Sequence, residues 1–98
     1  MITNQKREGN KLTVYIHGKI DTSATPVLEE ELISSLDGVE ELVLDLSDMN
    51  YISSAGLRVF LTAQKRMNAQ GKMTMVGVNE TVEEIFDITG LLDIFTIQ

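Results

Sequence analysis

The feature that most constrains the fold is an apolar run that is followed closely by a helical pattern. Residues 42–46 (Leu-Val-Leu-Asp-Leu) are typical of a strand, and residues 55–71 have apolar side chains at helical spacing. Ser53 and Ser54 lie between them, where the strand leads into the helix. A helix start offers unpaired backbone N–H groups and the positive end of the helix dipole. The position suits a serine that caps the helix and equally a serine that accepts a phosphate.

Strand and helix patterns alternate along the rest of the chain. The predicted order is a strand at 2–7, a turn at Gly9 and Asn10, a strand at 12–17, a helix ending before Gly38, a strand at 42–46, a helix at 55–71, a strand at 73–78, a helix from Asn79 to Gly90 and a strand at 95–97. This ββαβαβα(β) order predicts an α/β fold, a mixed sheet of four to five strands with helices packed on it. A length of 98 residues predicts one domain, 1–98.

Three details of this prediction concern packing. Residues 42–46 lack alternation, so helices are expected on both faces of that strand. The first helix is expected to follow a cap at Ser23 or Thr25, and Val27 is expected to widen its inward leucine stripe. Thr89 is expected on the inner face of the last helix.

Composition excludes several functional classes. The net charge of −7, from 15 acidic and 8 basic residues, argues against nucleic acid or an anionic membrane surface as the main partner. The chain has no cysteine, which excludes disulfides and thiol chemistry. No apolar stretch approaches the roughly 20 residues that span a bilayer, and the first residues do not resemble a signal peptide. We therefore expect a cytoplasmic protein without membrane insertion.

The residues that usually carry catalysis are missing or misplaced. A hydrolase serine needs a histidine base, and the single histidine, His17, lies in a predicted strand on the side away from its apolar residues. Ile52 occupies the first glycine position of a nucleophile elbow. We expect a binding protein and no enzyme.

The sequence also gives little support for a metal site or a nucleotide site. Asp21, Asp45 and Asp48 lie at or near predicted strand ends, but their spacing has no metal specificity, and Asp48 is expected to open a turn. Gly56 is isolated and belongs to no phosphate-binding glycine motif. We predict no metal and no cofactor.

Two adjacent serines exceed what a helix cap requires. A single capping serine contributes about 1 kcal/mol and needs no further function. Here Ala55 and Gly56 follow, and small side chains keep the approach to the hydroxyls open. Glycine inside a helix costs roughly 0.5–1 kcal/mol relative to alanine, so close approach of another backbone is expected at Gly56.

Three stretches carry a family resemblance: residues 18–21 (Gly-Lys-Ile-Asp), 44–47 (Leu-Asp-Leu-Ser) and 52–57 (Ile-Ser-Ser-Ala-Gly-Leu). Over essentially its whole length the chain resembles a STAS domain, specifically a stand-alone bacterial anti-sigma factor antagonist. The resemblance implies a GHKL-type anti-sigma factor as partner, which is also a serine/threonine kinase. It implies that the unphosphorylated antagonist displaces the sigma factor, that the kinase inactivates it by phosphorylating one serine, and that a serine phosphatase reverses this.

The family motif assigns the phosphorylated residue to Ser54, two positions before Gly56. Ser53 stands where the family often has aspartate, Ala55 stands for a second Ser/Thr, and Asp21 matches an expected acidic position. The expected partner-binding residues are Asp21, Asp48, Ser53, Ser54, Ala55, Gly56 and Arg58. The alternative is a constitutive STAS scaffold subunit of a stressosome-like or lipid-transport ABC complex, in which both serines only cap the helix.

Overall fold

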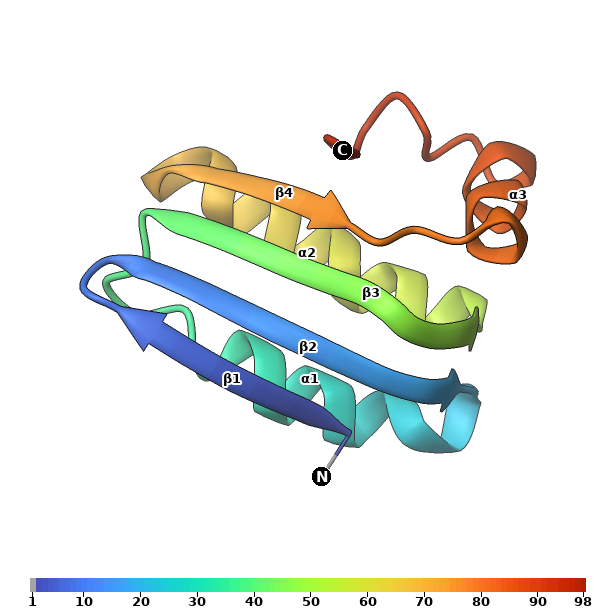
Figure 1. Cartoon of the computed structure of the whole chain (residues 1–98), viewed down its shortest axis with the longest axis horizontal. Helices are drawn as coiled ribbons and strands as arrows, with labels where there is room; N and C mark the ends of the chain where they lie inside the picture. Colours follow the sequence, from blue (N-terminus) through green and yellow to red (C-terminus); the bar gives the residue numbers. More distant parts are fainter. Residues whose placement is uncertain (1) are drawn as a thin grey trace.

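The computed structural model describes residues 2–98, and these form a four-stranded sheet with helices packed against it (Figure 1). The elements are β1 (Thr3–Glu8), β2 (Lys11–Ile20), the short 3-10 helix η1 (Thr22–Ala24), α1 (Thr25–Ile33), β3 (Glu41–Ile52), α2 (Ser54–Gln70), β4 (Lys72–Val76) and α3 (Glu80–Ile88). The predicted mixed sheet is confirmed: β1 and β2 pair antiparallel, whereas β2–β3 and β3–β4 pair parallel. The predicted strand at 95–97 is reduced to a single bridge between Met75 and Ile97.

Helices α1 and α2 lie on the same face of the sheet (Figure 1). The strand order β1-β2-β3-β4 follows the chain, so both crossovers, β2–α1–β3 and β3–α2–β4, step in one direction across the sheet. Right-handed crossovers in one direction place their helices on one face. The expectation that both faces of β3 are covered is therefore wrong. Leu42, Leu44 and Leu46 are buried under the helices, while Val43 and Asp45 face the other way and are half-buried.

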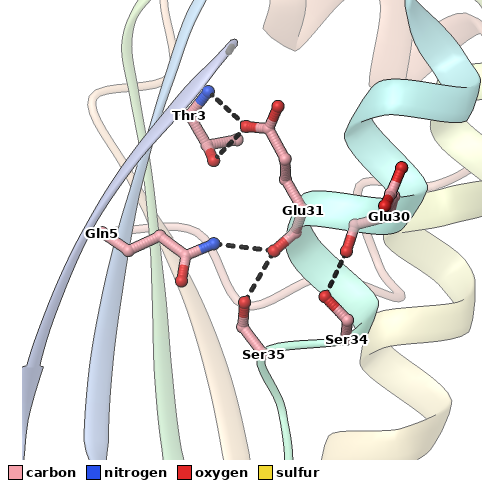
Figure 2. A pocket seen from close by; sticks show the side chains of 6 residues that line it. All are labelled: Thr3, Gln5, Glu30, Glu31, Ser34 and Ser35. Atoms are coloured by element: carbon pink, nitrogen blue, oxygen red, sulfur yellow. Dashed lines mark hydrogen bonds between the residues drawn. The ribbon is translucent and has the colours of Figure 1, made fainter.

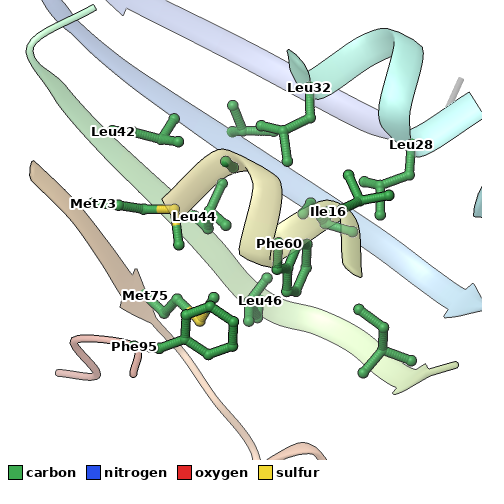
Figure 3. Close-up of a cluster of buried hydrophobic side chains, with 14 of the residues drawn as sticks. Ile16, Leu28, Leu32, Leu42, Leu44, Leu46, Phe60, Met73, Met75 and Phe95 are labelled. Atoms are coloured by element: carbon green, nitrogen blue, oxygen red, sulfur yellow. The ribbon is translucent and has the colours of Figure 1, made fainter. Parts of the chain in front are cut away.

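The core fills the space between the sheet and these two helices (Figure 3). Leu44 of β3 and Met75 of β4 are fully buried there, together with Phe60 of α2. Phe95, from the segment after α3, packs its ring edge-on against Phe60, with ring centroids 6.4 Å apart, and lies 5.4 Å from the ring of Phe86. The C-terminal segment thus closes the core beside β4.

Edge strand β1 is fastened to α1 through the side chain of Glu31 (Figure 2). The Glu31 carboxylate accepts hydrogen bonds from the backbone N–H and the hydroxyl of Thr3, at 3.0 and 2.6 Å. The Gln5 side chain donates to the backbone carbonyl of Glu31 at 2.7 Å. Burial acts to raise the pKa of Glu31, but the hydrogen bonds from Thr3 and Ile2 outweigh it and hold the pKa below its ordinary value. The carboxylate is therefore charged at neutral pH and holds the edge strand on the helix.

The start of α1 differs from the sequence prediction. Neither Ser23 nor Thr25 caps α1; instead Asp21 caps η1 by accepting a hydrogen bond from the Ala24 N–H at 3.1 Å. Val27 lies about 120° around α1 from the middle of the stripe formed by Leu28 and Leu32, and it is consequently 41% exposed and not part of this inward stripe. On α3, the expected inward position of Thr89 is also wrong, because it is exposed and its hydroxyl bonds back to the Ile85 carbonyl.

Candidate functional site

The ends of β2 and β3 position the start of α2. Ile20 and Ile52 are paired in the parallel ladder, and the Ser53 N–H donates to the Ile20 carbonyl at 2.8 Å, which extends the pairing by one residue. The Ser53 hydroxyl then accepts from the Gly56 N–H at 3.1 Å. Ser53 is only 7% exposed. It is therefore the N-cap of α2, with its oxygen occupied by the helix.

Ser54, the first residue of α2, has the opposite environment. It is exposed, and its hydroxyl makes no hydrogen bond to the described part of the chain. The first backbone bond of the helix runs from the Leu57 N–H to the Ser53 carbonyl, so the N–H groups of Ser54 and Ala55 have no acceptor within the helix. A reachable hydroxyl thus lies beside unpaired N–H groups at the positive end of a 17-residue helix.

Gly56 is required by side-chain packing. A Cβ atom at this position would lie 2.8 Å from Ile52 Cγ1 and 3.2 Å from Ile20 Cγ2. The expected close approach of another backbone is wrong, because the neighbours are these two buried isoleucine side chains. Since Gly56 is itself buried, it sets the distance between α2 and the strands and does not form the exposed surface.

Asp21 lies directly after Ile20, the residue that bonds Ser53, and η1 packs against α2. Its carboxylate accepts hydrogen bonds from the Ser23 hydroxyl at 2.7 Å and from the Ala24 N–H at 3.1 Å. These bonds, with that of Ser23 the largest cause, lower the pKa of Asp21. A fixed negative charge therefore borders the start of α2.

The Asp48 side chain contacts β2 and not the start of α2. Its carboxylate bonds His17 Nδ1 at 2.8 Å, and the other ring nitrogen of His17 lies 3.0 Å from the Asn4 amide. The expected turn at Asp48 is wrong, because β3 continues to Ile52 through two register shifts against β2. The structure thus brings Asp21, Ser53, Ser54, Ala55 and Gly56 together, whereas Asp48 is paired with His17 on β2.

Arg58 completes the exposed surface together with Tyr51 and Lys19, which the sequence interpretation did not assign to the site. Arg58 is exposed one helical turn after Ser54, and within residues 2–98 its guanidinium forms no ion pair. Tyr51 is 39% exposed at the end of β3, and the Lys19 ammonium lies 5.5 Å from its ring centroid. The position of Tyr51 next to inward-facing Ile52 was the signal available in the sequence.

Among residues 2–98, no three His, Cys, Asp or Glu side chains are grouped so that they could hold a metal ion. None of the helices in this range is long and apolar enough to cross a bilayer.

This geometry defines a class of protein: a small α/β domain in which one serine caps a helix and the next serine is exposed at the start of the same helix. The family model of the STAS domain matches residues 1–98, and the chain belongs to this family. It is 37% identical over 94 residues to the anti-sigma-B factor antagonist of Bacillus subtilis, covering 95% of this chain and 86% of that protein. It is 30% identical over 97 residues to the anti-sigma-B factor antagonist of Listeria monocytogenes, covering 96% and 84%.

Solved structures agree with this fold. An anti-sigma factor antagonist from Mycobacterium paratuberculosis superposes with a TM-score of 0.85 at 23% identity, covering 97% of this chain and 82% of that one. The antagonist SpoIIAA in its unphosphorylated form gives a TM-score of 0.82 at 14% identity, covering 98% and 87%. The Bacillus SpoIIAA in the phosphorylated form gives 0.74 at 13% identity, covering 98% and 90%.

Proposed function

We propose that this chain is an anti-sigma factor antagonist whose docking surface surrounds the start of α2 and is switched by phosphorylation of Ser54. The observation that carries the proposal is the division between the two serines. Ser53 is buried and occupied as the cap, while Ser54 is exposed with a free hydroxyl. The relatives in Bacillus and Listeria, which are anti-sigma-B factor antagonists by name, support the antagonist part of this proposal.

In the unphosphorylated state, the surface offers groups that suit a protein partner. Tyr51 supplies an exposed aromatic contact, and Arg58, which forms no ion pair within residues 2–98, supplies a cation one turn from Ser54. Aromatic and arginine side chains are the residues that most often dominate binding energy at interfaces. We infer that these residues contact the ATP-binding domain of a GHKL-type anti-sigma factor, with the small Ser54 and Ala55 side chains allowing close approach.

Phosphorylation changes the charge of this surface and leaves the fold intact. A phosphoryl group adds about −1.5 to −2 charges and three acceptor oxygens. The unpaired N–H groups at the start of α2 favour an anion, and Arg58, four residues on, can pair with it. The negative charge of Asp21 and the close packing of the docked partner both disfavour the phosphoryl group. Binding is therefore lost while the fold is kept, and the similarity of this chain to both forms of SpoIIAA supports such tolerance.

The test is a binding measurement with the GHKL-type anti-sigma factor of the source organism. Ser54→Ala should bind as the wild type does, and Ser54→Asp should bind at least tenfold more weakly, a loss of about 1.4 kcal/mol. Ser53→Asp is the matched control, because it adds the same charge one residue earlier at a buried capping position. Equal affinity of Ser54→Ala and Ser54→Asp would refute the switch.

Phosphorylation itself is tested by incubation with this kinase and ATP, followed by intact-mass measurement. One added phosphoryl group is expected on the wild type and none on Ser54→Ala. An unmodified wild type would instead support the constitutive scaffold, in which both serines only serve the helix.

A further inference from the structure

The face of the sheet opposite α1 and α2, here called the open face, carries no helix of the described chain (Figure 1). It consists of the strand residues that alternate with the core, as far as Asp48 on β3, whereas Tyr51 at the end of this strand belongs to the docking surface. Its centre is formed by β-branched side chains, Thr13 on β2, Val43 on β3 and Thr74 on β4, which are neighbours in the ladder and half-buried. A flat surface of this kind can pack against a second sheet.

One end of the open face carries a row of alternating charges. The strand register places Glu8 beside Lys11, Lys11 beside Glu41, and Glu41 beside Lys72, so the row reads minus, plus, minus, plus from β1 to β4. Within residues 2–98, Lys11, Glu41 and Lys72 form no ion pair, and Glu8 pairs only with Lys6, at 3.6 Å on the exposed edge strand. The charges of this row are therefore largely available to another molecule.

We propose that two copies of this chain pair through their open faces, about a two-fold axis that runs along the strands. Such an axis reverses the strand order, so β1 lies over β4 of the second copy and β2 over β3. Glu8 then faces Lys72 of the second copy, and Lys11 faces Glu41. A row that alternates in sign over an even number of strands is complementary to its own reversed copy. A second copy of this chain is therefore the partner that fits the open face.

The next polar row follows the same pairing. Tyr15 and Asp45 are neighbours on β2 and β3, so the two-fold axis places each Tyr15 hydroxyl over an Asp45 carboxylate of the second copy. The net charge of the face also favours this arrangement. The chain carries −7, whereas the open face combines Lys6, Lys11 and Lys72 with only four carboxylates, those of Glu8, Glu41, Asp45 and Asp48. Repulsion between two copies is therefore weaker through this face than through the rest of the surface.

The size of the face sets the expected affinity. Four strands about 4.8 Å apart, paired over the five residues of β4 at about 3.3 Å each, give roughly 320 Å² per copy, or about 640 Å² in total. Stable interfaces bury about 1,200–2,000 Å², so the dimer is weak and forms at high protein concentration. Ser54 lies at the start of α2, on the helix side of the sheet, and stays accessible in the dimer.

The experiment is sedimentation velocity at low ionic strength, over a concentration series that extends to the highest concentration at which the protein stays in solution. The wild type should form dimers, and added salt should weaken them because the paired charges are exposed. Lys72→Glu should weaken the dimer at least tenfold, since it places two carboxylates together at both ends of the row. Lys65→Glu, on the exposed side of α2, makes the same charge change away from the open face and should leave the dimer intact.

The double variant Glu8→Lys/Lys72→Glu distinguishes this arrangement from other dimers. It restores the net charge of the wild type and the opposite signs of the two facing positions, so dimer formation should return. Within one copy, residues 8 and 72 lie on opposite edges of the sheet, about 14 Å apart, so a rescue must act between copies. A monomeric wild type, an unaffected Lys72→Glu variant or a double variant that stays monomeric would each overturn the proposal.

Discussion

The different roles of Ser53 and Ser54 predict different effects on stability when each is replaced by alanine. Ser53→Ala removes the oxygen that accepts the Gly56 N–H at 3.1 Å, in a position that is 7% exposed. Loss of an N-cap costs typically about 1 kcal/mol, and an N–H left without an acceptor in a buried site adds to this. We expect a total loss of about 1–2 kcal/mol in the free energy of unfolding.

Ser54→Ala removes an exposed hydroxyl that forms no hydrogen bond within residues 2–98. Alanine is the better helix former by roughly 0.5 kcal/mol, so the net change should stay within about 0.5 kcal/mol of the wild type. Ser53→Asp should retain the stability that Ser53→Ala loses, because aspartate caps a helix as well as serine does and favours the dipole.

The assay is urea unfolding followed by circular dichroism, with thermal unfolding as a second measurement. Unchanged m-values would show that the variants differ in stability and not in the unfolded state. Ser53→Ala should lower the Tm by about 4–8 °C for each kcal/mol lost. The assignment fails if both alanine variants lose the same stability, or if Ser53→Asp falls as far as Ser53→Ala.

Two further predictions concern packing and the edge strand. Gly56→Ala should destabilise by about 1–2 kcal/mol, because overpacking against Ile20 and Ile52 costs about 1–3 kcal/mol and the helix propensity of alanine returns only about 0.5–1; a higher urea midpoint would contradict it. Glu31→Gln should destabilise by about 1 kcal/mol at neutral pH, where the charged carboxylate holds Thr3. Because the folded pKa of Glu31 is lowered, its contribution is present above the unfolded value of about 4.3 and lost as the pH falls through the folded pKa. Urea midpoints of the two proteins should therefore converge as the pH falls below the unfolded value and through the lowered folded pKa, and a constant difference down to strong acid would argue against this role.

Local patterns were sufficient to predict the elements and the start of α2. The spacing of Val59, Phe60, Ala63 and Met67 predicted a helix face that is buried in the structure. The serine pair marked the helix start, since Ser53 caps and Ser54 opens α2. These features depend on neighbours within a few residues along the chain, which the sequence displays directly.

Features that depend on strand order were not predictable. Val43 is apolar, so residues 42–46 resembled a strand covered on both faces, although Val43 belongs to the open face. Only the strand order places both crossover helices on the other side. The pairing of Asp48 with His17 depends likewise on extra residues in β3 that shift the register, and no local signal marks them.

The same topology separates the two proposed surfaces. The alternating charge row contains Glu41, the first residue of β3, whereas Ser54 follows Ile52, the last residue of this twelve-residue strand. The two therefore lie toward opposite ends of a molecule whose longest dimension is 33 Å, several times the screening length of about 8 Å at physiological ionic strength. A charge added at Ser54 acts on the docking surface and hardly on the row. Because the helices lie on one face only, phosphorylation can control partner binding while the sheet face pairs with a second copy independently.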